Sequence, residues 1–416
     1  MNLTSRALRL CLVPAVVLAA ARAQGQSVEE ARALLAKPQV AAAFAHVDQE
    51  REHILREWIA VTEINAPSGH ERERAAHVEK LLRGYKLASV RYDAAGNLVA
   101  VRKGTGGGPN VVFDAHLDTV FQPGLQIKAT VRGGRVYAPG IGDDTRNIEA
   151  LLAAIRALDA AQVQTRGDLV FVFTVEEETT MRGAKAYVDE NKGRIDAYVA
   201  LDGGYETFTY GGIGINWYRH HFIGPGGHTR SATPPYSATL PLARAIARIY
   251  ELPVPRDPSS NLNIGMLGGA EVVNAKASDA WFTVDLRSTS ADVIADLERR
   301  IAVILQEEAE RAGVTVKTDV ISASPPAQLP GNRESALVRT AEAVHRAMGF
   351  DARPTITGSN NSSAALRAGV HSISTGAGPC DDAHAVTENC EIEPFYKGTK
   401  KIVLLAVALA QLDERP

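Results

Sequence analysis

The stretch VVFDAHLDT, residues 111–119, decides the fold because it joins an apolar run to the polar side chains of His116 and Asp118. Residues 111–115 are mostly apolar and bounded by polar turns, which is typical of a strand covered on both faces. His116 and Asp118 follow directly at the carboxyl end of this strand. Open α/β sheets place their functional sites at that end. The stretch therefore predicts an α/β sheet with its chemistry at the strand ends.

Short apolar runs alternate with helical segments on either side of this stretch. Helical spacing covers residues 28–82, interrupted by a turn at 66–69. Buried strands that alternate with helices are typical of a sheet with helices on both faces, so we expect a three-layer α/β/α fold. The predicted strands are residues 98–101, 111–115, 169–175 and 197–201, and the predicted helices are 148–160, 184–191 and 334–348.

The rhythm changes after Gly214, where the predicted order becomes strand, helix, strand, strand, helix, strand. This order is that of a ferredoxin-like α+β unit. We therefore expect an inserted α+β domain at residues 214–325, within a catalytic domain formed by 24–213 and 326–416. The predicted strands are 215–223, 261–267, 280–286 and 314–320, and the predicted helices are 237–250 and 291–312.

Length and charge limit the function classes. A chain of 416 residues is long for one core, which agrees with two domains. The net charge is -3, from 45 basic and 48 acidic residues, so no basic surplus is available to bind a phosphate backbone. We expect no nucleic-acid partner and, after the N-terminal segment, no membrane span.

The N-terminal segment resembles a secretory signal. Arg6 and Arg9 precede a short apolar run at residues 10–21, and Ala21-Arg22-Ala23 supplies small residues for cleavage. We therefore predict a signal peptide at residues 1–23 and a periplasmic or secreted mature chain. An uncleaved anchor is the alternative.

Two of the three cysteines remain after removal of this segment, namely Cys380 and Cys390. Disulfides persist in the compartments that exported proteins reach. A bridge between these two residues and a pair of free thiols both remain open, because the sequence does not give the distance between them.

Acidic and imidazole side chains recur at the predicted strand ends. Asp143 and Asp144 are adjacent in a Gly-rich turn before a helix, where like charges repel unless a cation lies between them; helix capping is the alternative. Glu176, Glu177 and Glu178 follow the strand at 169–175. Three consecutive acids at the exit of a buried strand indicate a metal site more than a solvent-exposed surface; a cluster of acids in a loop is the alternative.

Asp202 follows the next strand, and His384 lies in a late polar loop. Each segment alone is a weak signal. Together, two histidines and at least three carboxylates are the ligands that two zinc ions require, with a bridging Asp and a water between the ions.

These residues resemble those of the co-catalytic zinc metallopeptidases, a family that includes peptidase T, carboxypeptidase G, aminoacylase and succinyl-diaminopimelate desuccinylase. The resemblance covers residues 50–410, including a lid or dimerisation domain. It implies two Zn²⁺ ions per chain, for which Co²⁺ or Mn²⁺ can substitute. The implied metal ligands are His116, Asp143, Glu178, Asp202 and His384.

The resemblance also implies roles in catalysis. Asp118 orients His116, and Glu177 is the general base; the triple Glu also permits Glu176 and Glu177 as the pair in another register. His228, in a Gly-Gly-His turn of the inserted domain, resembles the residue that stabilises the developing oxyanion.

Substrate contacts are implied for Arg287, in the inserted domain, and for Asn361. Asn361 stands where the family has an acid, and Thr145-Arg146-Asn147 replaces the usual Lys-Gly after the Asp pair. Because the metal ligands are intact, these departures bear on the choice of substrate more than on hydrolysis.

The sequence therefore predicts an exported dizinc metallopeptidase that acts on short peptides as an aminopeptidase, like peptidase T, and forms a homodimer through the inserted domain. A carboxypeptidase or an N-acyl amino acid deacylase is the alternative within the family. A zinc- or peptide-binding relative without activity is the alternative outside it.

Overall fold

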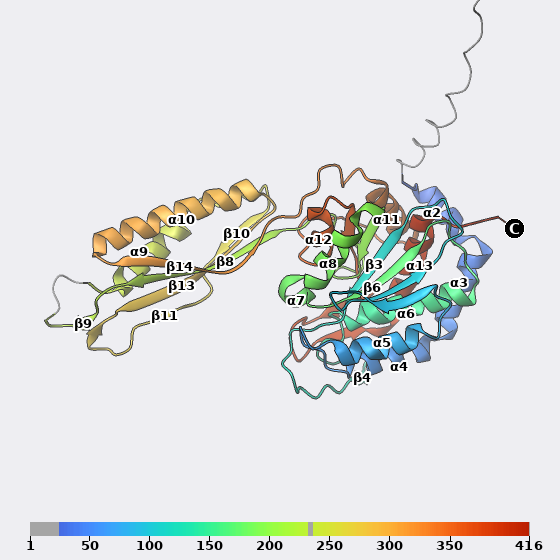
Figure 1. Cartoon of the computed structure of the whole chain (residues 1–416), viewed down its shortest axis with the longest axis horizontal. Coiled ribbons are helices and arrows are strands. Elements are labelled where there is room, and N and C mark those ends of the chain that lie inside the picture. The colour runs from blue at the N-terminus through green and yellow to red at the C-terminus, as the bar shows by residue number, and fades with distance from the viewer. Residues whose placement is uncertain (1–24, 232–235, 416) are drawn as a thin grey trace, which may run out of the picture. The chain divides into compact units, whose positions relative to one another are not determined.

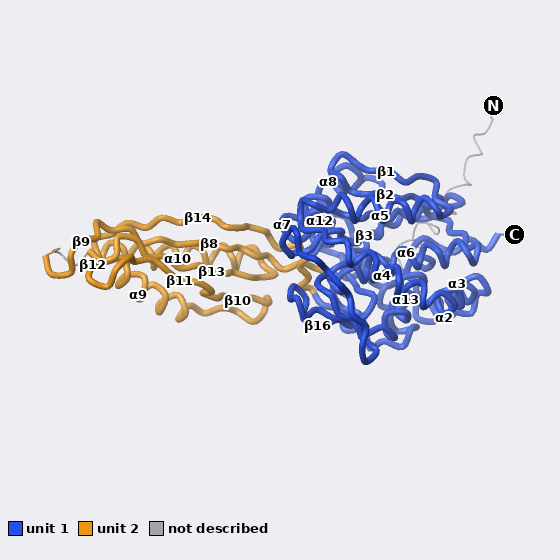
Figure 2. Tube along the Cα trace, turned by 90° about the horizontal axis from the view of Figure 1, so that it is seen from below, with its two compact units in different colours: residues 1–210, 329–355, 360–416 blue, residues 211–328, 356–359 orange. Residues whose placement is uncertain are grey.

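The computed structural model describes residues 25–231 and 236–415, which form two compact units (Figures 1 and 2). The first unit comprises residues 1–210, 329–355 and 360–416 as far as they are described, and the second comprises 211–328 and 356–359 with the same restriction. The expected signal peptide, residues 1–23, lies outside the described residues. The sequence predicts an inserted domain at 214–325. The second unit also includes residues 356–359, because Gly358 forms backbone hydrogen bonds with Gly211 and Ile213.

A six-stranded sheet forms the centre of the first unit. Five strands run in the same direction, and the second strand of the order is antiparallel to its neighbours on both sides. The order across the sheet is β1 (Ser89–Tyr92), β2 (Leu98–Arg102), β6 (Leu169–Thr174), β3 (Val111–His116), β7 (Ala197–Ala200) and β15 (Ser372–Ser374).

Both faces of this sheet are buried, and successive side chains face opposite layers. On β3, Val111 and Phe113 pack into the larger core, whereas Val112 packs into a smaller core on the other face. This explains why the strand is a continuous apolar run instead of an alternation of polar and apolar residues. The predicted α/β/α arrangement is confirmed.

Helices of the first unit lie around the central sheet (Figure 1), and their apolar residues contribute to both cores. The helices of the larger core are α2 (Val28–Leu35), α3 (Pro38–Gln49), α4 (Arg51–Thr62), α5 (Arg72–Leu82), α6 (Thr145–Ala160), α11 (Ala336–Ala347) and α13 (Ile392–Ala410). The helices of the smaller core are α8 (Arg182–Asn191) and α12 (Ser362–Arg367). Two short helices, α7 (Glu177–Thr180) and η1 (Lys192–Arg194), flank α8 in the chain.

A small antiparallel sheet completes the first unit. Its order is β16 (Cys380–Asp381), β17 (Asn389–Glu391), β5 (Arg135–Tyr137) and β4 (Thr130–Arg132). Cys380 and Cys390 lie opposite each other on β16 and β17 and form a disulfide. The pairing that the sequence left open is therefore present, and it closes the loop that carries His384.

The second unit is the predicted ferredoxin-like fold. The order across its sheet is β10 (Ser260–Asn263), β13 (Asp279–Ser288), β8 (Gly214–Ile223) and β14 (Thr315–Ser324), with β11 (Leu267–Gly269) also paired to β13. Apolar residues of α9 (Thr239–Tyr250) and α10 (Ala291–Ala312) pack on one face of this sheet. A further pair, β9 (Gly227–His228) and β12 (Ala275–Lys276), is separate.

One predicted strand of this unit differs. The expected strand at 261–267 is broken into β10 and β11, because Asn263 lies opposite Asp285 and Leu267 opposite Phe282, so that four steps of this segment face three steps of β13. No helix within the described residues combines the length and apolar character that crossing a bilayer needs.

Candidate metal centre

The carboxyl ends of three parallel strands bring the predicted site residues to one edge of the central sheet. His116 ends β3, Glu177 and Glu178 follow β6, and Asp202 follows β7. Asp143 lies in the turn that leads into α6. The fold therefore brings four distant segments of sequence together at this edge, where other open α/β sheets also place their sites.

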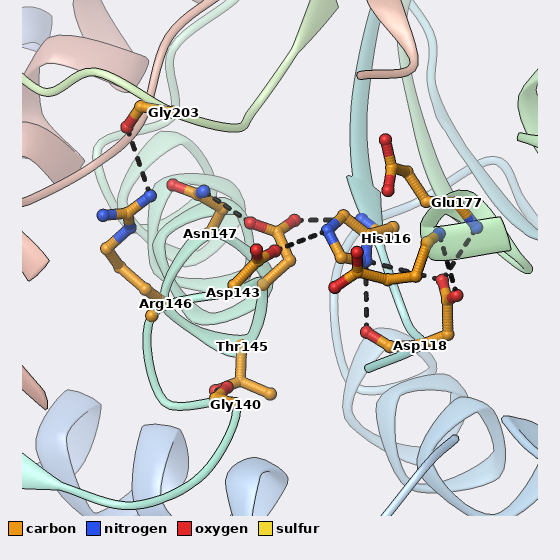
Figure 3. Close-up of polar contacts among 12 residues, drawn as sticks. His116, Asp118, Gly140, Asp143, Thr145, Arg146, Asn147, Glu177 and Gly203 are labelled. Carbon is orange, nitrogen blue, oxygen red and sulfur yellow. Dashed lines mark hydrogen bonds and ion pairs between the residues drawn. The ribbon is translucent and has the colours of Figure 1, made fainter. Parts of the chain in front are cut away.

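His116 is fixed from both sides of its ring. Its Nε2 lies 2.9 Å from Asp143 Oδ1, whereas its Nδ1 lies 3.1 Å from the Asp118 carbonyl and 3.4 Å from Asp118 Oδ1 (Figure 3). The side chain is only 2% exposed. A donor contact from Nδ1 to Asp118 leaves Nε2 as the nitrogen that can bind a cation.

Asp118 is itself held by three donors. Its Oδ1 accepts the backbone N–H of Glu177 at 2.9 Å, and its Oδ2 accepts the backbone N–H of Glu178 at 3.1 Å and the Ser68 hydroxyl at 2.6 Å. Asp118 therefore links the His116 ring to the first turn of α7, which carries Glu177 and Glu178 (Figure 3 shows the contact to Glu177). The sequence marked the segment around Ser68 only as a turn, and nothing local in the sequence indicates this contact across 50 residues.

Asp143 lies between the two histidines. Its Oδ1 faces His116 Nε2 at 2.9 Å, and its Oδ2 faces His384 Nε2 at 3.1 Å. His384 Nε2 also lies 3.2 Å from Glu178 Oε2. Burial alone would raise the pKa of Asp143, but the two imidazoles outweigh burial and lower it, so this carboxylate is ionised. A carboxylate with one oxygen toward each histidine has the geometry of a bridging ligand.

Two groups of potential ligand atoms form around this carboxylate, each with its atoms within 4.8 Å of one another. One contains His116, Asp143 and Asp144, and the other contains Asp143, Glu178 and His384. Asp143 belongs to both, as a bridging residue must. Among the described residues, Asp202 joins neither group at this distance. Its charge nevertheless acts on Asp144, since it raises the pKa of that residue in addition to the larger effect of burial.

Asp144 has a different use from the one that the sequence offered. Its Oδ2 accepts the backbone N–H of His116 at 2.9 Å and its Oδ1 accepts the Asn147 amide at 2.6 Å. It precedes α6 but makes no capping hydrogen bond with its side chain, so the capping alternative is wrong for this residue. Both carboxylate oxygens of Asp144 therefore accept hydrogen bonds from the protein, and the bond to the His116 N–H orients the end of β3.

The acids of the centre require added positive charge. Burial raises the pKa of Glu178 to about 7, and burial followed by the charge of Asp143 raises that of Asp202 to about 6. Burial, with further contributions from Asp202 and Glu178, raises the pKa of Glu177 well above its ordinary value, although His116 opposes this. Crowded carboxylates of this kind are stabilised as anions by a cation among them.

Glu178 gives a direct test of whether metal ions fit. Its Oε1 is buried, and within the described residues no group donates a hydrogen bond to it. A buried carboxylate oxygen without a donor, near imidazole nitrogens and a second carboxylate, matches the ligand chemistry of zinc and similar divalent ions. The residues present therefore fit two divalent cations that share Asp143.

A cavity of about 850 Å³ adjoins this cluster within the first unit. Asp143 and Asp202 line one part of it, and Tyr205 and Pro379 line another. Arg146 also contributes, held by the carbonyls of Gly203 and Gly378 (Figure 3 shows the Gly203 contact). A space of this volume beside the metal ligands can accept a small organic substrate.

Two of the remaining predicted residues belong to the second unit, and one belongs to the interior of the first unit. His228 and Arg287 belong to the second unit, where His228 is exposed and Arg287 forms an ion pair with Asp285 at 3.1 Å. Their roles stay predictions. Asn361 is buried, and its amide lies 2.9 Å from the Thr174 hydroxyl and 3.3 Å from Asp114 Oδ1. These interior contacts give the Asn361 amide a structural use, and its substrate contact stays a prediction.

Comparison with known proteins identifies a family. The sequence profile of peptidase family M20/M25/M40 matches residues 112–408, which is most of the chain. Among curated proteins, the uncharacterized protein YqjE of Bacillus subtilis is 22% identical over 372 residues, covering 85% of this chain and 97% of that protein. Carboxypeptidase G2 of a Pseudomonas species is 28% identical over 141 residues, 33% of this chain and 34% of that protein.

Solved structures share the fold. A tripeptidase from Staphylococcus aureus superimposes with a TM-score of 0.77 at 22% identity, covering 87% of this chain and 99% of that one. The aminopeptidase PepT from Bacillus cereus gives a TM-score of 0.76 at 21% identity, with the same coverage of 87% and 99%. At these identities the likeness establishes the architecture and leaves the substrate open.

Proposed function

The chain belongs to peptidase family M20/M25/M40 and is a hydrolytic enzyme, and on that premise we propose that it is an exported dizinc aminopeptidase of short peptides. The observation that carries the proposal is Asp143, whose two carboxylate oxygens each face a histidine Nε2, at 2.9 and 3.1 Å. A shared carboxylate of this kind is the ligand that a pair of divalent ions requires.

We assign His116, Asp143 and Asp202 to one zinc ion, and Asp143, Glu178 and His384 to the other. Ions bound by these residues would lower the pKa of a water molecule toward neutrality and would polarise the carbonyl of the scissile bond. His116 contributes through Nε2, because its Nδ1 is directed at Asp118. Asp118 also accepts the backbone N–H of Glu177, and so holds this residue beside the metal ligands.

Glu177 is the general base of the proposed mechanism. Its carboxylate takes a proton from the attacking water and then passes that proton to the leaving amine. Its raised pKa, caused first by burial, suits a group that must both accept and release a proton. His228 of the second unit is the proposed hydrogen-bond donor to the oxyanion that develops on the carbonyl.

Short peptides with a free amino terminus are the proposed substrates, because the two structural neighbours described above are a tripeptidase and an aminopeptidase. The cavity of about 850 Å³ beside Asp143 and Asp202 has room for a di- or tripeptide. The test compares hydrolysis of unblocked tripeptides with hydrolysis of N-acylated amino acids. Turnover of the tripeptides supports the proposal, and turnover of blocked substrates alone refutes it.

A second candidate, an N-acyl amino acid amidohydrolase or carboxypeptidase, is favoured by the match to carboxypeptidase G2. It predicts the opposite outcome in the same assay. A non-catalytic zinc- or peptide-binding protein would retain two metal ions and hydrolyse neither class of substrate.

Export and dimerisation are further parts of the proposal. Cleavage near Ala23 would deliver the chain to a compartment in which the disulfide between Cys380 and Cys390 persists. N-terminal sequencing of the mature protein tests this, since a mature chain that begins at Met1 contradicts export by cleavage.

In the second unit, β14 is an edge strand with Val320 and Ile321 exposed, and we propose that a second copy covers this edge. Light scattering of a Val320→Lys variant, which should be monomeric, tests that part.

A further inference from the structure

Glu388 lies beneath the turn that carries the bridging carboxylate, and it is fully buried. Its Oε2 accepts the backbone N–H of Gly140 at 2.6 Å, and its Oε1 accepts the backbone N–H groups of Gly142 at 2.9 Å and of Asp143 at 2.8 Å. The Glu388 carboxylate therefore touches three of the four residues from 140 to 143 through their main chain. None of these contacts uses the side chain of Asp143, which stays directed at the two histidines.

We propose that Glu388 is a positioning residue that fixes the spacing between Asp143 and His384. It thereby prepares the site formed by Asp143, Glu178 and His384, which we call the second metal site; the first is the site that contains His116. The inference rests on the proposed metal centre. Glu388 acts through the backbone of Asp143 and does not touch a reacting atom.

The packing of the turn against Glu388 is close enough to require a glycine. A Cβ at position 142 would lie 2.7 Å from Glu388 Oε1 and 2.9 Å from Cys380 Cβ, closer than real contacts allow. Only glycine at position 142 therefore lets the turn approach the Glu388 carboxylate. The approach in turn determines where Asp143 leaves the turn, because the N–H groups of Gly142 and Asp143 bond to the same oxygen.

The same loop carries the other ligand of the second site. His384 and Glu388 both lie between Cys380 and Cys390, whose disulfide closes the loop at its base. The backbone carbonyl of Glu388 also accepts the N–H of Ala138, which anchors the loop to the chain just before the turn. One short loop thus supplies a metal ligand and holds the turn that supplies its partner.

This arrangement explains how an exposed histidine can keep a fixed position beside Asp143. The His384 side chain is 53% exposed, and its backbone has φ of 67°, a left-handed conformation that is costly for a residue other than glycine. Contacts elsewhere in the loop must offset that cost. The three hydrogen bonds of Glu388 and the disulfide are contacts that do so.

The experiment measures Zn²⁺ affinity in the full chain by competition with a chromophoric chelator, in the wild type and in two variants. Glu388→Gln places an amide nitrogen against at least one backbone N–H, so at least one of the three bonds is lost. Glu388→Asp keeps the charge but withdraws the carboxylate by one methylene. We expect both variants to bind the second Zn²⁺ about 10- to 100-fold more weakly than the wild type, with the first ion retained.

Two control variants separate this effect from general destabilisation. Glu308→Gln changes a buried carboxylate of the second unit that pairs with Arg248 at 2.8 Å. Asp382→Asn changes an exposed acid of the same loop, whose Oδ2 accepts the Thr387 hydroxyl. Both controls should bind two Zn²⁺ ions with wild-type affinity.

The visible spectrum of the Co²⁺-substituted protein gives a second readout, because it reports the ligand geometry without requiring turnover. Gly142→Ala disturbs the same contact from the side of the turn, and it replaces the Glu388 variants if those do not fold. Wild-type Zn²⁺ affinity in Glu388→Gln or in Glu388→Asp overturns the inference; wild-type affinity in the Asp variant alone would show that charge matters and position does not. A wild-type protein that binds no Zn²⁺ would instead overturn the proposed function itself.

Discussion

The two histidines of the metal centre are held in opposite ways. His116 ends a central strand, its side chain is 2% exposed, and contacts to Asp118 and Asp144 fix its ring and its backbone. His384 belongs to a loop outside the central sheet and is 53% exposed. One half of the centre is therefore built into the core of the sheet, and the other half is built by a short, disulfide-closed loop.

This difference implies unequal metal sites. A ligand that the core already holds in place loses little freedom when an ion binds, whereas a loop ligand must be ordered by local contacts. We expect the ion beside His116 to bind more tightly and the ion beside His384 to leave first. Asp143 belongs to both halves, so loss of the weaker ion should still alter the environment of the tighter one.

The largest loss of turnover should come from substitution of the general base, which belongs to neither ligand set. Glu177→Gln removes the proposed base but keeps the backbone N–H that bonds to Asp118. We expect turnover of a tripeptide to fall by about 10²- to 10⁴-fold while both Zn²⁺ ions remain bound. The measurement combines steady-state kinetics with metal analysis of the same sample, and a near wild-type rate would remove Glu177 from the mechanism.

Substitution of the two histidines tests the contrast itself. His116→Ala takes a buried ring from between Asp118 and Asp143, and we expect the metal-free protein to lose about 2 kcal/mol of unfolding free energy. His384→Ala removes the ion pairs to Asp143 and Glu178, but this side chain is 53% exposed, so solvent weakens the pairs and the metal-free protein should lose less, about 1 kcal/mol. Urea unfolding of both variants in chelator gives the comparison; equal losses would show that the two halves do not differ.

Opening the disulfide should affect only the loop half. In the double variant Cys380→Ser and Cys390→Ser, the loop that carries His384 and Glu388 loses its covalent closure. We expect the more weakly bound Zn²⁺ ion to lose about tenfold in affinity, because loss of a contact that orients a metal ligand typically has an effect of this size. The affinity of the tighter ion should not change. Zn²⁺ titration of the variant measures this, and an equal loss of affinity at both sites would contradict the assignment of the loop to one half.

The smallest effect is expected in the core half. Ser68→Ala removes one of the three donors to Asp118 and leaves the two backbone donors from Glu177 and Glu178. A single hydrogen bond contributes about 1 kcal/mol, so kcat should fall by about fivefold with KM unchanged. A fall as large as that of Glu177→Gln would mean that Asp118 does more than orient its neighbours.

Most of the fold could be predicted because its signals are local. The runs at 111–115 and 169–175 are apolar without a break, and the structure buries these strands on both faces. The β-α-β-β-α-β order of the second unit could be predicted from periodicity in the same way. Residues 356–359 could not be assigned to that unit, because the backbone pairing of Gly358 with Gly211 and Ile213 leaves no mark in side-chain composition.

The candidate site shows the same limit. The acids that follow β6 and β7 could be placed near His116, because parallel strands end at one edge of a sheet. His384 could be placed only through family resemblance, since it lies in a loop between two short strands of the smaller sheet. The direction of the Asp144 side chain and the reach of Ser68 to Asp118 depend on three-dimensional contacts between segments far apart in the chain.

The most direct test of the account is a calorimetric Zn²⁺ titration of the metal-free wild-type chain. The structure predicts two ions per chain, bound with distinct affinities, and His384→Ala should abolish the weaker phase alone. Binding of no zinc, or two equal phases that both survive in His384→Ala, would contradict the claim that Asp143 joins a core-built site to a loop-built one.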